Sequence, residues 1–311
     1  MSTLIDAVKD YLSLRRRLGY KLEDPGRWLT GFVSFLEREG ATRITTEGAL
    51  RWAMQPADGQ PAHWAARLRA VRLFAEYHKG LDPETEVPPQ GLLPHRPRRR
   101  QPYIYEDSEI EALIREAEKL PSRTGLRPHT YLTLLGLLAV TGIRIGEALA
   151  LNRDDVDLGQ GTLTIRQGKF NKSRLVPIHS STQEVLRGYA SLRNIVFPKP
   201  RGMSFFLSEP GTRLEISCVY RTFVKLSRRI GLRDSRDSHG PRLHDLRHTF
   251  TVRTVMEWYR AGLDVDSRMP TLSTYLGHAH VTDTYWYLSA VPELLCLAAA
   301  RVAPMQGGTQ P

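Results

Sequence analysis

Cysteine is scarce in this sequence of 311 residues, where only Cys218 and Cys296 occur, far apart and in no ligand motif. Such scarcity argues against a disulfide framework or a zinc ribbon and suits a reducing cytoplasm. No uninterrupted apolar run approaches about 18 residues and no signal-peptide pattern is present, so we expect no membrane segment. A Gly-x4-Gly-Lys-Ser/Thr loop is also missing, and we therefore expect no ATP site.

Acidic residues are too few to balance the basic ones. There are 33 Asp and Glu against 44 Lys and Arg, which gives a formal charge of +11 and a pI near 9.8. A surplus of positive charge favours a polyanionic partner, because binding phosphates releases condensed counterions. A membrane surface is the other polyanion to consider, but with no membrane segment expected we interpret the charge as a sign of nucleic-acid binding.

The first part of the chain, residues 1–81, is predicted to be a helical domain, because apolar residues recur there at helical spacing. The residues of these stripes are Leu4, Val8, Leu12, Leu18, Trp28, Phe32, Phe35, Leu36, Leu50, Trp52, Leu68, Val71 and Ala75. Arg67, Arg69 and Arg72 lie near the opposite side of the last predicted helix. They either contact DNA or form a solvated basic face.

Proline marks residues 82–102 as a linker between two domains. Six prolines in this range forbid a continuing helix and keep the chain extended. Near its end Arg98, Arg99 and Arg100 form a basic cluster, which either follows a DNA backbone or is simply solvated.

The remainder, residues 103–311, is predicted to be mainly α-helical with one small β-hairpin, an α+β domain. Ser108-x-x-Glu111 reads as a capping box that opens a helix, and residues 131–140 are apolar on nearly every side, as in a buried helix. Two short β-prone runs, 163–165 and 175–178, flank a polar loop and predict the hairpin.

Four separate stretches of this domain carry reactive side chains. The first stretch contains Arg144 and Glu147, and the second contains Lys169, Lys172 and Arg174. The third contains His244, Arg247 and His248, and the fourth contains His278, Tyr285 and Tyr287. Taken singly, each stretch has an ordinary explanation, such as a surface ion pair or a packing aromatic residue. His244 and His248, four residues apart, could bind a metal, but no third ligand is evident and Arg247 would repel a cation.

The combination of these residues is more specific than any one of them. Two arginines, a lysine, histidines and a tyrosine, without clustered acidic metal ligands, favour phosphoryl transfer without a metal. An arginine can hold two phosphate oxygens and stabilise the charge of the transition state. A tyrosine hydroxyl can attack phosphorus and conserve the bond energy as a phosphotyrosine.

The order of these motifs resembles the active site of the tyrosine recombinases, the phage integrase family. The shared pattern is Arg-x-x-Glu, a lysine on a hairpin, His-x-x-Arg, Gly-His, and a tyrosine nine residues after that histidine. The resemblance covers the chain from about residue 103 to the C-terminal helix. More loosely, the first domain is similar to the family's core-binding, SAM-like DNA-binding domain, which implies a two-domain DNA clamp.

Carried over by position, the resemblance implies that Arg144 and Arg247 grip the scissile phosphate of duplex DNA. His278 would add a donor to the same phosphate, and Glu147 would orient its neighbours.

The resemblance also implies which residues transfer protons and which one attacks the phosphate. Lys169 would protonate the leaving 5′ oxygen, and His244 would help to move the proton at the tyrosine. Tyr287 would be the nucleophile that forms a 3′-phosphotyrosyl link, without metal, nucleotide or other cofactor. Tyr285 lies two residues before it, and only one of the two can face the phosphate, because such neighbours on a helix point about 200° apart.

Lys172 and Arg174, behind Lys169 on the hairpin, are predicted to contact DNA. Compared with compact family members, the chain has an extra segment over residues 264–270. After the tyrosine, a proline followed by a Leu- and Ala-rich run predicts a helix over about residues 291–302. This helix either packs on its own domain or docks in a neighbouring protomer.

The leading interpretation is therefore a site-specific recombinase or integrase of a mobile element. It would act in the cytoplasm on double-stranded DNA, as a homo-oligomer that forms a tetramer on synapsed sites, with or without partner recombinases. Two alternatives remain: a type IB-like topoisomerase, which would relax supercoils without a specific site, and a catalytically silent DNA-binding protein, which would form no covalent adduct.

Overall fold

The computed structural model describes residues 3–55, 57, 59–93, 101–166, 173–199, 201–234, 236, 240–278, 280–290, 293–296 and 299. The chain divides into two compact units, Met1–Arg100 and Gln101–Pro311. Within the described ranges, no helix is both long enough and apolar enough to cross a bilayer.

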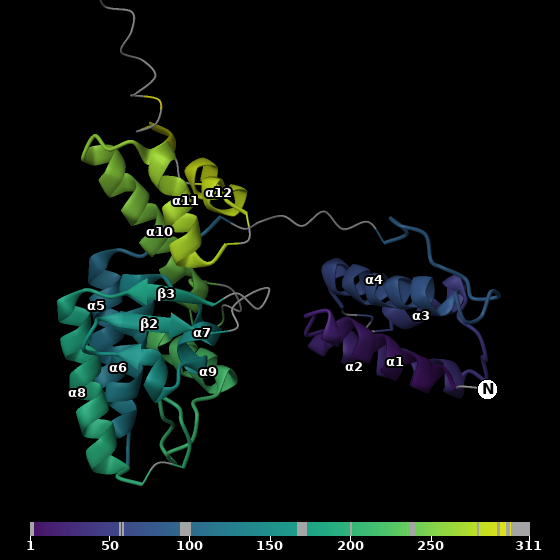
Figure 1. The fold of residues 1–311 in the computed structure, drawn as a ribbon, viewed down its shortest axis with the longest axis horizontal. Coiled ribbons are helices and arrows are strands. Elements are labelled where there is room, and N and C mark those ends of the chain that lie inside the picture. The colour runs from purple at the N-terminus through teal and green to yellow at the C-terminus, as the bar shows by residue number, and fades with distance from the viewer. Residues whose placement is uncertain are drawn as a thin grey trace, which may run out of the picture. The chain divides into compact units, whose positions relative to one another are not determined.

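The described part of the first unit consists of helices around one apolar core (Figure 1). These helices are α1 (Leu4–Arg17), α2 (Glu23–Arg38), α3 (Thr46–Ala53) and α4 (Pro61–His78). Val8, Phe32 and Val71, from three of the predicted stripes, are almost fully buried. Leu18 was predicted to share the α1 stripe, but it follows the last turn of that helix and is 64% exposed.

The predicted linker begins too early. The backbone N–H of Glu86 donates to the carbonyl of Ile44 at 3.0 Å, and the Glu86 carboxylate accepts from the backbone N–H of Thr46 at 2.7 Å. Leu93 packs against the helical core. Residues 82–93 are therefore part of the first unit, while Arg98, Arg99 and Arg100 lie outside the described residues.

The second unit is mainly helical with one small sheet, as predicted. Its elements are α5 (Asp107–Glu118), α6 (Leu126–Thr141), α7 (Ile145–Ala150), η1 (Arg153–Asp155), β1 (Val156–Asp157), β2 (Thr162–Ile165), β3 (Arg174–Pro177), α8 (Ser180–Val196), α9 (Ile216–Arg229), α10 (Leu243–Arg260), α11 (Val265–Leu276) and α12 (Thr282–Ala290). The strands are antiparallel in the order β1-β2-β3. Strands β2 and β3 form the predicted hairpin, in which Leu163 faces Val176 and Ile165 faces Arg174. The sequence did not predict β1.

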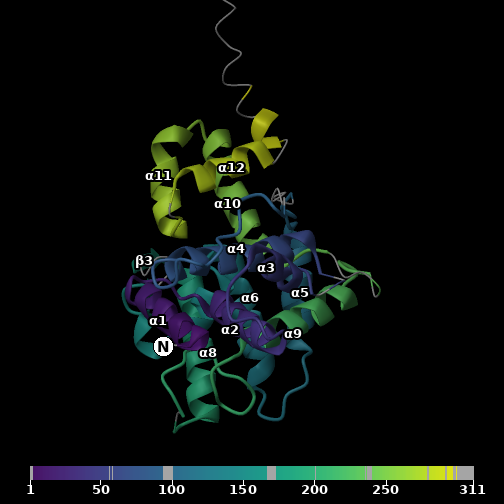
Figure 2. The same ribbon diagram turned by 90° about the vertical axis from the view of Figure 1, so that its right-hand side faces the viewer.

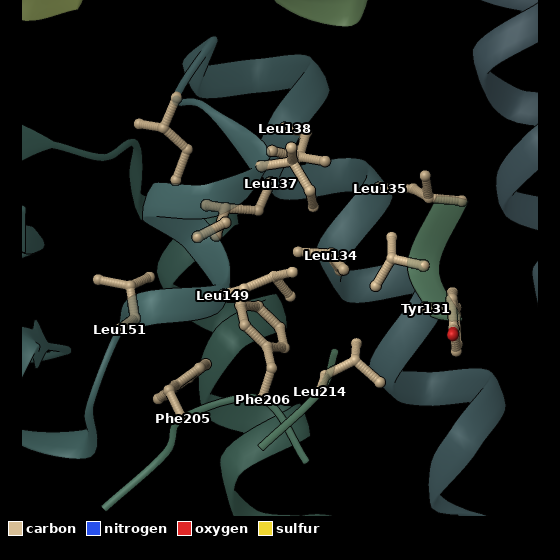
Figure 3. Packing of buried hydrophobic residues seen from close by; sticks show 14 of the residues in the cluster. Tyr131, Leu134, Leu135, Leu137, Leu138, Leu149, Leu151, Phe205, Phe206 and Leu214 are labelled. Atoms are coloured by element: carbon tan, nitrogen blue, oxygen red, sulfur yellow. The ribbon is translucent and has the colours of Figure 1, made fainter. Parts of the chain in front are cut away.

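Helix α6 lies in the middle of the core of the second unit. Figure 3 shows its leucines packed towards Leu149 of α7 and towards Phe206, and Leu134 is fully buried. A helix that is apolar all round is stable only where other elements surround it. The prediction of a buried helix is thus confirmed, although Val140 in the same stretch is 53% exposed.

The structure corrects the predicted capping box and shows the conformation of the extra segment. The capping box of α5 is formed by Glu106 and Glu109, whose carboxylate accepts from the Glu106 N–H at 2.8 Å, so Ser108 lies inside the first turn. The extra segment 264–270 is helical and forms the first half of α11, which Asp264 caps by accepting from the backbone N–H of Ser267.

Helices α10, α11 and α12 gather at one end of the second unit (Figures 1 and 2). Their contacts form a small separate core that includes Val252 and Leu272. Leu294, beyond α12, is fully buried in this core, and Glu293 pairs with Arg260 at 2.8 Å. Of the predicted C-terminal helix, residues 293–296 are helical and pack on their own domain.

Candidate active site

The ends of several elements bring most of the predicted catalytic residues together. Arg144 is the N-cap of α7, His244 and Arg247 lie in the first two turns of α10, and His278 follows the end of α11. Strand β3, which contacts α11, begins at Arg174. Residues more than one hundred positions apart thus share one site.

A glycine turn aims Arg144 into the site. Gly142 ends α6 with a φ of 60°, and a Cβ atom there would lie 2.5 Å from the ring of Phe250. Only glycine suits both the left-handed backbone and this close approach. The chain then reverses, and the Arg144 guanidinium donates to Glu147 Oε1 at 2.9 Å. These two side chains thus form an ion pair at the start of α7.

Arg247 is held by backbone carbonyls inside the protein. Its side chain is buried, and its guanidinium donates to the carbonyls of Gly142 at 2.8 Å and of Leu276 at 2.7 Å. The Leu276 carbonyl also accepts from Arg144 Nη1 at 3.4 Å. Two guanidinium groups therefore meet at one carbonyl at the C-terminal end of α11, where the helix dipole attracts positive charge.

Glu147 is the buried counter-charge of the site. Its two carboxylate oxygens accept from Arg174 Nη1 at 3.1 Å and Nη2 at 2.8 Å, in addition to the contacts from Arg144. Burial alone would raise the pKa of Glu147, but the hydrogen bonds from Arg174 and Arg144 lower it to about 2. Arg174 was predicted to contact DNA; instead its guanidinium is buried against this carboxylate.

His278 is oriented by a residue that the sequence analysis missed. Its Nδ1 atom lies 2.7 Å from the hydroxyl of Thr284, which is fully buried on α12. Burial, and next the positive charges of Arg247 and Arg144, lower the pKa of His278 to about 3. The imidazole is therefore neutral at pH 7.

His244 is also neutral, because burial and then the charge of Arg247 lower its pKa to about 4. Its ring meets the ring of His248 edge to face, with the centroids 4.7 Å apart. Among the residues that the structure describes, no three His, Cys, Asp or Glu side chains are grouped as metal ligands. Neutral imidazoles beside crowded guanidinium groups make this site suitable for an anion with several oxygen atoms.

Helix α12 is attached on two sides. The Trp286 ring contacts His248 of α10, with centroids 5.8 Å apart, and the Tyr285 hydroxyl donates to Asp266 of α11 at 3.2 Å. Tyr287 lies in α12, but its side chain is outside the described residues, as are Lys169 and Lys172.

The three arginines predicted on α4 have different surroundings. Arg67 stacks on the Trp52 ring at 3.9 Å from its centroid and donates to the Trp52 carbonyl at 2.8 Å, so it packs within its own unit. Arg72 pairs with Glu76 at 2.6 Å, whereas Arg69 is exposed. Arg69 and Arg72 line a groove of about 430 Å³ between α4 and residues 89–93.

Comparison with known proteins agrees with this architecture. The model of the phage integrase family matches residues 104–293. The chain is 49% identical over 306 residues to the putative integrase/recombinase y4rB of Sinorhizobium fredii, covering 97% of this chain and 98% of that protein. It is 30% identical to the tyrosine recombinase XerC of Chlamydia caviae, covering 71% of this chain and 65% of that protein.

Solved structures share the fold at low sequence identity. The Tn1549 transposon integrase in complex with transposon right end DNA is 14% identical, with a TM-score of 0.66, covering 98% of this chain and 99% of that one. A lambda integrase dimer bound to a core site is 17% identical, with a TM-score of 0.59, covering 92% of this chain and 95% of that one.

Proposed function

This chain belongs to the phage integrase family of tyrosine-type site-specific recombinases, and from this membership we propose that it cleaves and rejoins duplex DNA through a 3′-phosphotyrosyl intermediate on Tyr287. The observation that carries the proposal is the convergence of Arg144, Arg247 and His278 around the end of α11. These residues lie within or next to three different helices, and a merely solvated basic surface would not need them to meet.

The two arginines bind the non-bridging oxygens of the scissile phosphate. Each guanidinium is already fixed by carbonyl or carboxylate oxygens, so its orientation costs nothing at the moment of reaction. As negative charge builds on phosphorus in the transition state, Arg144 and Arg247 stabilise it. His278 adds a neutral donor: with Nδ1 accepting from the Thr284 hydroxyl, the ring proton is on Nε2, which donates to the phosphate.

The proposed reaction balances without an external energy source. The Tyr287 oxygen attacks phosphorus, and the bond to the 5′ oxygen of the next nucleotide breaks. The tyrosine proton passes to the neutral imidazole of His244, while Lys169 gives a proton to the leaving 5′ oxygen. One phosphoester is exchanged for another, so rejoining is the reverse of the same steps. Lys172 and the basic cluster Arg98, Arg99 and Arg100 are proposed as contacts to the DNA backbone.

The DNA partner and the assembly follow from the function. The similar Tn1549 and lambda integrases are bound to DNA in their structures, and the lambda integrase is a dimer. We propose that this chain also binds duplex DNA and acts as a homo-oligomer, a tetramer on synapsed sites. Its place of action is then the cytoplasm, at the nucleoid.

The function is tested with a DNA substrate nicked close to the cleavage site. The short fragment that carries the new 5′ hydroxyl then dissociates after cleavage, so rejoining is blocked and the covalent adduct accumulates. We expect covalent protein–DNA adducts that resist denaturant and form equally in EDTA, since the positive charge comes from side chains. Strict dependence on Mg²⁺ would contradict the mechanism. Binding without any adduct would identify a silent DNA-binding protein, and rapid relaxation of plasmids without a specific site would identify a topoisomerase.

A further inference from the structure

We infer that Arg174 is a positioning residue of the active site, a buried tie that fixes Glu147 and the turn after α11 and so holds the phosphate-binding groups in place. The inference rests on the proposed function, because it concerns the geometry needed for cleavage. It replaces the expectation that Arg174 contacts the DNA backbone.

The donors of Arg174 are directed into the protein. Nε donates to the Tyr275 carbonyl at 2.7 Å, while Nη1 and Nη2 donate to the two oxygens of Glu147. The side chain is only 11% exposed. An arginine that tracks a DNA backbone needs its planar fork to face solvent, whereas this fork is matched to a carboxylate, with two parallel hydrogen bonds.

The contacts of Arg174 join three elements of the site. Strand β3 carries it, α7 carries Glu147, and the end of α11 supplies the Tyr275 carbonyl. Glu147 Oε1 also accepts from Arg144, whose Nη2 returns to the Gly277 carbonyl at 3.1 Å. These bonds close a ring of contacts, so moving Arg174 would move both Arg144 and the turn that carries His278.

The backbone of the turn is shaped to admit Arg174. Gly277 has a φ of 69°, and a Cβ atom on it would lie 2.6 Å from Arg174 Nη1. The guanidinium thus lies directly against a backbone position where a side chain does not fit. The same turn positions the next residue, His278.

Removing Arg174 should make cleavage sensitive to acid. The pKa of Glu147 is about 2 because the hydrogen bonds from Arg174 and Arg144 outweigh its burial. On its other side is a pocket of about 250 Å³ whose charged groups, Asp155 and Arg166, pair with each other. Without Arg174 the burial of Glu147 is no longer fully offset by its hydrogen bonds, so the pKa of Glu147 rises. A protonated Glu147 then no longer holds Arg144 by charge.

The test compares Arg174→Gln with wild type in single-turnover cleavage of the nicked substrate, between about pH 5 and pH 8. Arg187→Gln is the matched control. Arg187 lies on α8, and its replacement removes one positive charge and one hydrogen bond to a carbonyl, that of Leu158. We expect DNA affinity and its salt dependence to stay unchanged in Arg174→Gln. Cleavage should fall about 100-fold, the loss typical of a misplacement by about 1 Å.

The pH profile separates positioning from a general loss of stability. The deficit of Arg174→Gln should widen as the pH falls, and adding Glu147→Gln to it should remove this widening without a further large loss. A deficit that is constant with pH, or additive losses in the double variant, would overturn the inference. So would weaker binding with a salt slope reduced by about 0.9, which is the signature of a lost phosphate contact.

Arg174→Lys serves if the glutamine variant does not fold. Lysine keeps the charge but not the two-point contact with the carboxylate, so cleavage should fall while DNA affinity is kept. Cleavage at the wild-type rate would contradict the positioning role of Arg174. If the wild-type protein forms no adduct at all, the proposed function fails, and the inference fails with it. A wild type that cleaves beside an unimpaired Arg174→Gln contradicts the inference alone.

Discussion

Side chains in this site are fixed before any DNA arrives. Arg247 is held by the carbonyls of Gly142 and Leu276, and Arg144 by Glu147 and the turn after α11. Such preorganised donors stabilise charge that develops in a transition state without reorganising at that moment. The arginines should therefore matter more for cleavage than for DNA binding.

Replacing Arg247 or Arg144 by lysine tests this expectation. Each variant keeps its positive charge but loses the planar two-point grip. We expect cleavage to fall roughly 100- to 1,000-fold, as for the loss of one preorganised donor, with affinity changed little. Rates of single-turnover cleavage and binding titrations at one salt concentration measure both. Cleavage near the wild-type rate in both variants would mean that these arginines only bind the DNA backbone.

Thr284 controls the orientation of His278 through a single hydroxyl. Thr284→Val keeps the shape of the buried side chain but loses the contact with Nδ1. We expect cleavage to fall about 10- to 100-fold, with recovery in Thr284→Ser, which restores the hydroxyl. Thr254→Val is the control, because the Thr254 hydroxyl donates to the carbonyl of Phe250 in its own helix. Equal cleavage by Thr284→Val and wild type would show that this contact does not position His278.

Among the elements, the C-terminal end of α11 organises the site. Three successive carbonyls there, those of Tyr275, Leu276 and Gly277, accept hydrogen bonds from arginines of three other elements. A helix end presents such carbonyls without intrahelical partners, together with the negative end of the helix dipole. The turn that follows depends on a left-handed glycine.

Gly277→Ala should disturb this element in two ways. The left-handed backbone costs about 1 to 2 kcal/mol for a residue with a Cβ atom, and that atom would displace Arg174. We expect a lower melting temperature together with reduced cleavage. Gly262→Ala is a matched control, since Gly262 has a φ of 72° but, among the described residues, no atom within 4 Å of the added Cβ. It should cost stability alone; equal cleavage losses in the two variants would refute a specific role for Gly277.

The sequence predicted local features of the elements better than their meeting points. Arg144 and Glu147 are three residues apart, so helical geometry alone predicts that they share a face. Arg174 stands in a basic hairpin and resembles a surface residue; its burial depends on the Glu147 carboxylate and on the Tyr275 carbonyl, about one hundred positions later in the chain. The contact of Thr284 with His278 was missed because it needs the turn between α11 and α12.

Cap positions were missed for a related reason. The box of Ser108 and Glu111 has the favoured composition, yet Glu106 and Glu109 make the cap of α5. Several polar residues near a helix start can cap it, so composition alone does not select one of them. Helix existence and buried faces were more predictable, as α6 shows, because they depend on many residues at once.

At the scale of the whole molecule, the charge of +11 should make DNA binding strongly dependent on salt. The logarithm of affinity should fall by roughly 0.9 per log unit of salt for each phosphate neutralised. Arg69→Ala should reduce this slope, because Arg69 is exposed at the α4 groove. Arg67→Ala should instead lower the melting temperature, since Arg67 packs on Trp52. A flat salt response, or an unchanged slope in Arg69→Ala, would contradict a DNA-binding role for this face.

The central claim is that Tyr287 is the residue that joins the protein to DNA. The most direct measurement is to trap the adduct on a nicked substrate, digest it, and locate the nucleotide-bearing peptide residue by mass spectrometry. We predict that the nucleotide is on Tyr287, that Tyr287→Phe binds DNA but forms no adduct, and that Tyr285→Phe, which loses its hydrogen bond to Asp266, still forms one. An adduct on Tyr285, or one that persists in Tyr287→Phe, would contradict the account.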